Sequence, residues 1–139
     1  IKVINLKSGA FFVDTGSPHY VNYLDNIDEI DLIKQARAIR NSAEYINEGV
    51  NVNFIEKINN NIKMRTYERG VENETLSCGT GVTAAALVHA SNLSINKGKV
   101  DVFTRGGQLS VSFDFDGKYY QDVWLKGNAA YVFKGEIDG

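Results

Sequence analysis

The segment from Val82 to Leu93 limits the possible folds more than any other part of this chain, because apolar residues cover every side of its helical wheel. These residues are Val82, Ala84, Ala85, Ala86, Leu87, Val88, Ala90 and Leu93. A helix with one apolar stripe lies on the outside of a domain, whereas a helix that is apolar all round is enclosed by other elements. The sequence therefore predicts a helix in the centre of the domain, with His89 inside it as a core or hydrogen-bonded residue.

The rest of the chain is dominated by short segments with strand character. β-rich or alternating segments separated by turn residues predict strands at residues 2–6, 10–14, 20–24, 49–58, 62–67, 99–104, 108–115, 119–126 and 129–134. A second helix is predicted at residues 26–41, where acidic residues come first and basic residues later. We expect an α+β fold in which a curved, mostly antiparallel sheet wraps around the central helix. Trp124, Tyr131 and Phe133 are predicted to pack in the core or on the sheet.

Length, charge and cysteine content narrow the class of protein. The 139 residues fit one domain, and 15 Lys and Arg against 17 Asp and Glu, with no basic run, argue against nucleic acid as a partner. No signal peptide and no apolar run of about 20 residues is visible, which argues against a membrane. A single cysteine fits a reducing compartment, so we expect a cytoplasmic protein. Because the chain begins at Ile1 without methionine, we expect it to be truncated or processed.

The turn before the central helix concentrates the chemical groups. Cys78, the only cysteine, is followed by Gly79, Thr80 and Gly81, which leave the first backbone N–H groups of the helix uncovered. These groups lack partners inside a helix, and together with the helix dipole they favour a bound carboxylate or phosphate and a thiolate. Free cysteines are more often buried as small hydrophobic residues. Here the small neighbours would allow a ligand to approach, which favours a functional Cys78.

Four segments resemble the diaminopimelate epimerase family, in the order in which that family has them. The segment around the cysteine reads ERG and then ETLSCGTGVTAAA, and the others read DTGSPHYV, IRNSAEYINEGVNVNFIE and GNAAYVFKGEI. The motifs are long and specific, and they cover the whole chain. The resemblance is to the second half of a family member, so it implies a single domain equivalent to the C-terminal one of two similar halves.

The resemblance also implies roles for individual residues. Cys78 matches a catalytic cysteine, with His19 and Glu68 in supporting roles. Ser17 stands where the family usually has a substrate-binding asparagine, so a shorter hydroxyl group replaces an amide at that contact. The implied substrate-binding residues are Ser17, Asn51, Glu68, Arg69, Gly79 and Thr80.

In the family, two cysteines on opposite faces of a small-molecule substrate interconvert LL- and meso-diaminopimelate, without pyridoxal phosphate, another cofactor or a metal. The reaction belongs to lysine and peptidoglycan-precursor biosynthesis. This chain has one cysteine, so we expect it to bind weakly and to be inactive without an N-terminal half that carries the second. A homodimer remains open.

Three other functions fit the same residues. The chain could be a non-catalytic module that binds an amino acid or another anion at the helix start. It could be a hydrolase or transferase that uses Cys78 and His19. It could also be another racemase or isomerase with the same two-half architecture.

Overall fold

The computed structural model describes residues 1–139 and contains nine strands and two helices. In chain order they are β1 (Val3–Asn5), β2 (Phe11–Asp14), β3 (Pro18–Tyr23), α1 (Leu32–Arg40), β4 (Asn51–Ile58), β5 (Asn61–Glu68), β6 (Asn73–Thr75), α2 (Gly79–Asn92), β7 (Lys97–Thr104), β8 (Gly107–Phe115) and β9 (Tyr120–Gly127). Neither helix is long and apolar enough to cross a membrane.

All nine strands belong to one sheet, which confirms the predicted α+β class. Its order is β1-β2-β3-β4-β5-β7-β8-β9. The short strand β6 lies outside this order and pairs only with β5. The pairs β3/β4 and β5/β7 are parallel, and every other pair is antiparallel. The sheet is therefore mostly antiparallel, as predicted. Each parallel pair is joined by a crossover that contains a helix, α1 in the first case and α2 in the second.

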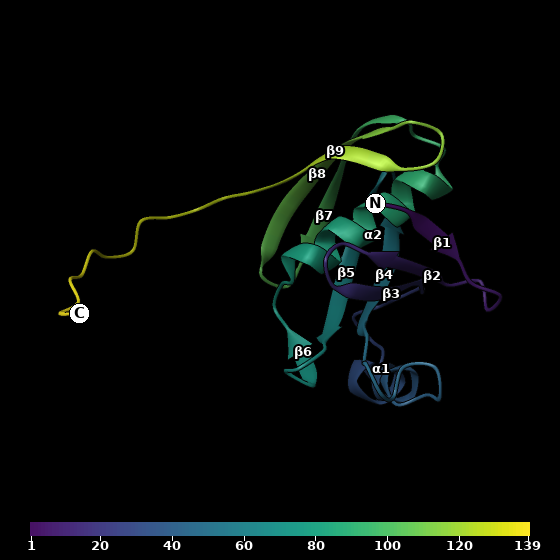
Figure 1. Ribbon diagram of the computed structural model, residues 1–139, viewed down its shortest axis with the longest axis horizontal. Helices are drawn as coiled ribbons and strands as arrows, with labels where there is room; N and C mark the ends of the chain where they lie inside the picture. The colour runs from purple at the N-terminus through teal and green to yellow at the C-terminus, as the bar shows by residue number, and fades with distance from the viewer.

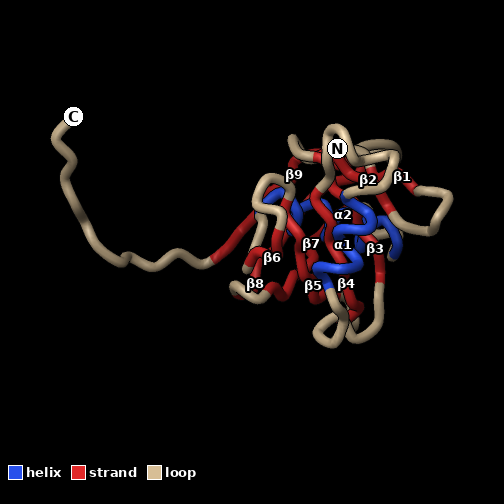
Figure 2. Tube along the Cα trace, turned by 90° about the horizontal axis from the view of Figure 1, so that it is seen from below, coloured by secondary structure: helices blue, strands red, loops and turns tan.

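Helix α2 is the centre of the molecule, as its composition predicts. Every residue from Gly81 to Ala90 is buried, and the sheet curls around the helix (Figures 1 and 2). The larger hydrophobic core joins this helix to residues of the surrounding strands, including Val13, Val21, Ile55 and Val111. A site at the start of α2 therefore stands on the most enclosed element of the fold.

Helix α1 covers the opposite face of the sheet. Leu32 and Ala36 pack with Val52, Phe54 and Tyr67 in a second, smaller core. Strand β4 separates the two cores, because successive side chains point to opposite faces. Val52 and Phe54 face α1, whereas Ile55 joins the α2 core. Asn51 and Asn53 alternate with Val52, so they share the α2 face with Ile55.

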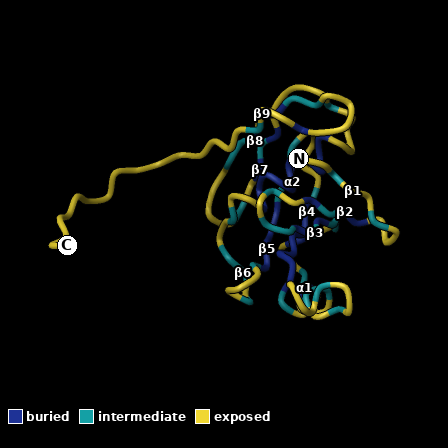
Figure 3. The backbone as a smooth tube through the Cα atoms, in the orientation of Figure 1, coloured by how far each residue is buried: buried dark blue, intermediate teal, exposed yellow.

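The structure differs from the predicted secondary structure in three places. Residues 128–139 form no strand and extend away from the body, so the strand predicted at 129–134 is wrong (Figure 3). A strand requires a partner for its backbone groups, and this segment pairs with none. The helix predicted at 26–41 covers only 32–40, because the Asp31 side chain caps it by accepting from the Lys34 N–H. Strand β6 was not predicted.

Aromatic residues near the C-terminus are also more exposed than predicted. Trp124 lies on β9 and is 67% exposed. Tyr131 and Phe133, on the extended segment, are 80% exposed or more. The prediction that these three residues pack in the core or on the sheet is wrong, because apolar character does not specify a neighbour.

Candidate functional site at the start of helix α2

Cys78 is the N-cap residue of α2, with extended backbone angles and no side-chain cap hydrogen bond. The first intrahelical bond runs from Val82 N to the Cys78 carbonyl at 2.8 Å. The N–H groups of Gly79, Thr80 and Gly81 precede it and so have no acceptor within the helix. Cys78 is half-buried and Gly79 and Thr80 are exposed. The sulfur and the uncovered N–H groups thus occupy the same end of the helix.

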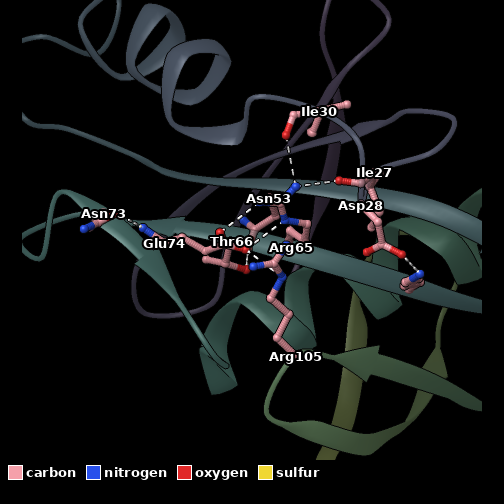
Figure 4. Close-up of polar contacts among 10 residues, drawn as sticks. Ile27, Asp28, Ile30, Asn53, Arg65, Thr66, Asn73, Glu74 and Arg105 are labelled. Atoms are coloured by element: carbon pink, nitrogen blue, oxygen red, sulfur yellow. Dashed lines mark hydrogen bonds and ion pairs between the residues drawn. The ribbon is translucent and has the colours of Figure 1, made fainter.

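The loop that leads to Cys78 is held by a network of ion pairs and hydrogen bonds (Figure 4). The Arg65 guanidinium donates to both carboxylate oxygens of Glu74 on β6, at 2.8 and 2.9 Å. Arg105, in the turn between β7 and β8, lies 3.2 Å from the same carboxylate. The next residue, Gly106, donates its N–H to the Leu76 carbonyl at 2.9 Å, two residues before Cys78. The hydrogen bond to Arg65 keeps the pKa of Glu74 below its ordinary value, so the pair is ionised.

His19 lies directly beneath the helix start and is fully buried. Its Nε2 is 2.9 Å from the Thr80 hydroxyl, and its Nδ1 is 3.0 Å from the Asn53 amide nitrogen. The Thr80 hydroxyl is in turn 3.5 Å from the Cys78 sulfur. Burial lowers the pKa of His19 to about 4, so the ring is neutral at physiological pH. His19 is thus connected to Cys78 through Thr80 and not by direct contact.

Asn51 organises the edge of the site next to His19, its neighbour across the β3/β4 pair. Its amide nitrogen donates to the Ser17 hydroxyl at 2.8 Å and to the Pro18 carbonyl at 3.0 Å. Its amide oxygen accepts from the Arg69 backbone N–H at 2.7 Å. Asn51 therefore ties together three segments that the sequence separates widely.

Glu68 and Arg69 lie at the end of β5, as the sequence indicated. The Arg69 guanidinium donates to the Glu48 carbonyl at 3.0 Å, and the side chain crosses Gly49. A Cβ at Gly49 would be 2.7 Å from Arg69 Cδ, and its φ of +79° also favours glycine. Glu68 is half-buried and pairs with Asn73 across β5 and β6. In this conformation no hydrogen bond joins either side chain to Cys78.

The structure thus brings Ser17, His19, Asn51, Thr80 and Cys78 into one connected region and leaves the charged groups of Glu68 and Arg69 at its margin. Sequence reasoning missed Asn53, whose amide is buried against His19. The signal was available, because Asn53 follows Asn51 on the same face of a strand, where asparagine is unusual. His89 is buried and bonds to the Tyr23 hydroxyl at 2.7 Å, which confirms the prediction for that residue.

A surface depression of about 380 Å³ adjoins the helix start. It is lined by Ile1, Thr15, Gly79, Thr80, Thr83, Val123 and Leu125. Thr15 donates its hydroxyl to the Thr80 carbonyl at 3.1 Å, so the turn between β2 and β3 borders the same space. No group of three or more His, Cys, Asp or Glu side chains is placed to hold a metal ion. The polar groups that line this depression are backbone groups and threonine hydroxyls, and Cys78 is not among its lining residues.

Comparison with known proteins identifies the family. The profile of the family described as diaminopimelate epimerase matches residues 11–132. The chain belongs to the diaminopimelate epimerase family. The diaminopimelate epimerase of Flavobacterium psychrophilum is 38% identical over 138 residues, which are 99% of this chain and 54% of that protein. The Methanocella arvoryzae enzyme of the same name is 45% identical over 126 residues, 91% of this chain and 43% of that protein. This member of the family spans about half the length of the curated relatives it matches.

Solved structures support the same architecture for this epimerase-family chain. A phenazine biosynthesis protein of the PhzF family from Enterococcus faecalis superposes with a TM-score of 0.54 at 18% identity, covering 80% of this chain and 38% of that one. A predicted epimerase from Pseudomonas aeruginosa gives 0.55 at 16% identity, covering 77% and 36%. At these identities the likeness concerns the fold alone.

Proposed function

We propose that this chain is the C-terminal half of a diaminopimelate epimerase and that Cys78 exchanges a proton with the α-carbon of the substrate. The observation that carries the proposal is the position of the sulfur. It lies half-exposed at the start of α2, beside N–H groups that no helical carbonyl satisfies. A single ligand can therefore contact the thiol and the helix start together.

The uncovered N–H groups suit the α-carboxylate of an amino acid. Those of Gly79 and Thr80 would donate to it, and the helix dipole adds the equivalent of roughly half a positive charge. When the α-proton leaves, negative charge spreads from carbon into the carboxylate, and fixed donors stabilise it best at that moment. The helix start would thus hold the substrate and also lower the barrier to proton removal.

Inversion needs a base on one face of the α-carbon and an acid on the other. The Cys78 thiolate takes the α-proton and becomes a thiol, while the electron pair of the C–H bond stays on the substrate. A second thiol then delivers its proton to the opposite face and becomes a thiolate. Because this chain has one cysteine, the second thiol would come from an N-terminal half outside these 139 residues. The chain alone would bind weakly and would not epimerise.

The remaining site residues would recognise the rest of the substrate. Glu68 and Arg69 offer a carboxylate for an ammonium group and a guanidinium for a carboxylate, the two groups at the distal end of diaminopimelate. Arg69 would have to exchange its bond to the Glu48 carbonyl for one to the ligand. Ser17 and Asn51 border the same side of the site. The Asn51 amide already bonds to Ser17, Pro18 and Arg69, so its role would be mainly to shape the site. The enzyme would act in the cytoplasm without a cofactor.

Proton exchange in deuterated water tests the proposal. A chimera would carry the N-terminal half of the Flavobacterium psychrophilum relative before Ile1. It is expected to incorporate deuterium at the α-carbon of LL-diaminopimelate and to form the meso isomer. The isolated chain should do neither. In the chimera, Cys78→Ala should abolish exchange and Ser77→Ala, next to it, should retain most of it. Inversion by the isolated chain at an enzyme-like rate would contradict the two-thiol mechanism.

A binding module that does no chemistry is the main alternative, and the uncovered N–H groups of Gly79 and Thr80 favour it equally. The two readings differ at the sulfur. For a binding module, Cys78→Ala in the chimera should leave the affinity for diaminopimelate unchanged, and the unmodified chimera should show no exchange. If Cys78 is catalytic, the unmodified chimera should exchange the α-hydrogen, and Cys78→Ala should lose this exchange but keep its affinity for diaminopimelate.

A further inference from the structure

A continuous chain of polar contacts runs from the sheet to the sulfur, and four side chains form it. The Asn53 amide nitrogen lies 3.0 Å from His19 Nδ1, His19 Nε2 lies 2.9 Å from the Thr80 hydroxyl, and that hydroxyl lies 3.5 Å from Cys78 Sγ. Asn53 and His19 are completely buried. This series of polar contacts thus starts in the core, at Asn53, and ends at the half-exposed thiol of Cys78.

The partners of Asn53 determine which of its amide atoms faces His19. The amide nitrogen also donates to the Tyr20 carbonyl at 3.1 Å, and a carbonyl can only accept. The amide oxygen accepts from the Thr66 hydroxyl at 2.9 Å (Figure 4). The atom next to His19 Nδ1 is therefore an N–H donor, and Nδ1 must be the ring nitrogen that accepts.

This assignment sets the direction of the remaining contacts. In a neutral imidazole one nitrogen accepts and the other carries the hydrogen. With Nδ1 accepting from Asn53, the hydrogen is on Nε2, which donates to the Thr80 oxygen. The hydroxyl hydrogen of Thr80 is then free to point toward the other partner within reach, the Cys78 sulfur. A hydrogen bond to a charged acceptor is stronger than one to a neutral acceptor, so it favours thiolate over thiol.

Close packing holds this series of polar contacts in place. A Cβ on Gly81 would lie 2.6 Å from the Asn53 amide oxygen and 3.3 Å from His19 Cε1. Only a glycine on this turn of α2 lets the helix approach the two side chains so closely. The Thr15 hydroxyl holds the Thr80 carbonyl from the other side. The neighbouring charges are Asp14 and Arg69, which act on His19 in opposite directions.

We propose that Asn53 is a positioning residue that holds His19 in its Nε2–H form, so that the Thr80 hydroxyl donates to Cys78 and stabilises its thiolate. The inference deepens the proposed function, on which it rests for the use made of the thiolate. It assigns Asn53 and the Thr80 hydroxyl to the preparation of Cys78 and distinguishes them from the N–H groups that would contact substrate.

The first test is the rate at which iodoacetamide alkylates Cys78 in the whole chain, measured from pH 5 to pH 10. Thr80→Val removes the hydroxyl with little change in shape. It should slow alkylation at pH 7 by about tenfold, the effect of one hydrogen bond to a charged group, and leave the rate at pH 10 unchanged. Thr80→Ser keeps the hydroxyl and should stay within about twofold of the unmodified chain.

Thr83→Val is the matched control for this test. Thr83 lies on the next turn of α2 and donates its hydroxyl to the Gly79 carbonyl at 3.0 Å, and it makes no hydrogen bond to the sulfur. Its loss should leave alkylation of Cys78 at pH 7 unchanged. If Thr80→Val and Thr83→Val slow the reaction equally, or if neither does, the Thr80 hydroxyl has no specific effect and the proposal is overturned.

The second test reads the hydrogen on His19 directly, from the ¹⁵N chemical shifts of its ring at pH 7. The unmodified chain should show a protonated Nε2 and a bare Nδ1. Asn53→Asp replaces the donor with a carboxylate, which can only accept, so Nδ1 should become protonated. A protonated Nδ1 in the unmodified chain would overturn the proposal even if the Asp variant does not fold. So would a bare Nδ1 in the folded variant.

Neither test requires substrate or a second half of the enzyme. A failure of the chimera to epimerise therefore leaves these results intact. Conversely, an unchanged alkylation rate in Thr80→Val would remove the role of Asn53 and Thr80 without touching the proposed role of Cys78.

Discussion

Single residues at the start of α2 determine how closely the helix approaches the sheet. Gly81 has no room for a methyl group, since its Cβ would lie 2.6 Å from the Asn53 amide oxygen. Gly79, half a turn earlier, faces only a methyl end of Leu125 at 3.1 Å. Substitution by alanine should therefore lower the free energy of unfolding more at Gly81 than at Gly79.

We expect Gly81→Ala to destabilise the chain by about 1–3 kcal/mol, because overpacking must displace Asn53 and His19. Gly79→Ala should cost less than about 1 kcal/mol, since a leucine methyl can move and alanine favours the helix. Urea unfolding followed by circular dichroism measures both. Equal losses in the two variants would contradict the packing described at Gly81.

His19 should make stability depend on pH between about 6.5 and 4. Burial lowers its folded-state pKa to about 4, whereas an unfolded histidine titrates near 6.5. In this window the unfolded state binds more protons than the folded state, so stability falls as pH falls. The loss should be on the order of 2 kcal/mol. Urea unfolding at pH 7 and pH 4.5 should show it, and His19→Gln should reduce the difference; an unchanged difference would count against a buried neutral His19.

At the scale of elements, β6 and the turn between β7 and β8 together hold the segment before Cys78. Glu74 is the shared partner of Arg65, which is 8% exposed, and of Arg105. Removing one member of a largely buried pair leaves the other charge without compensation. The loop that carries the cysteine therefore depends on a strand of only three residues.

Glu74→Gln should destabilise the chain by about 2 kcal/mol, because the Arg65 guanidinium would keep a neutral acceptor in place of a carboxylate. The matched control is Asp114→Asn, which removes the exposed pair with Lys97 at 3.5 Å and should cost less than about 0.5 kcal/mol. Both values come from urea unfolding at pH 7. A loss no greater than that of the control would mean that the Arg65–Glu74–Arg105 network does not stabilise β6.

At the scale of the whole molecule, the body ends with β9 and the last residues leave it (Figure 1). Tyr131, Val132, Phe133 and Ile137 are each 80% exposed or more. No residue of either core lies beyond Tyr120, and Val123 packs against the larger core. The final segment therefore contributes no contact to either core.

Deletion of residues 129–139 should leave the free energy of unfolding within about 0.5 kcal/mol of the full chain, because exposed terminal residues contribute little. Urea unfolding of both chains at pH 7 checks this. A substantially less stable truncated chain would show that the segment packs on the body in solution.

Much of the site could be predicted from sequence because it depends on neighbours along the chain. The all-round apolar pattern after Cys78 placed α2 in the core, and the small residues at 79–81 placed uncovered N–H groups beside the thiol. The strand-like pattern of residues 49–58 predicted the strand that carries Asn51, which is observed as β4. Ala129–Lys134 shows the limit, since a strand-like pattern found no strand to pair with.

The sequence by itself determined the central helix, the position of its one thiol and the α+β class, because side-chain periodicity and turn chemistry are local properties. Only the tertiary structure decided that β3 lies parallel to β4, which sets His19 beside Asn51 and lets Asn53 reach its ring. It also decided that the Arg69 guanidinium bonds to Glu48. These contacts join residues from 21 to 34 positions apart, and no local pattern specifies which distant strands pair or which side chains then meet.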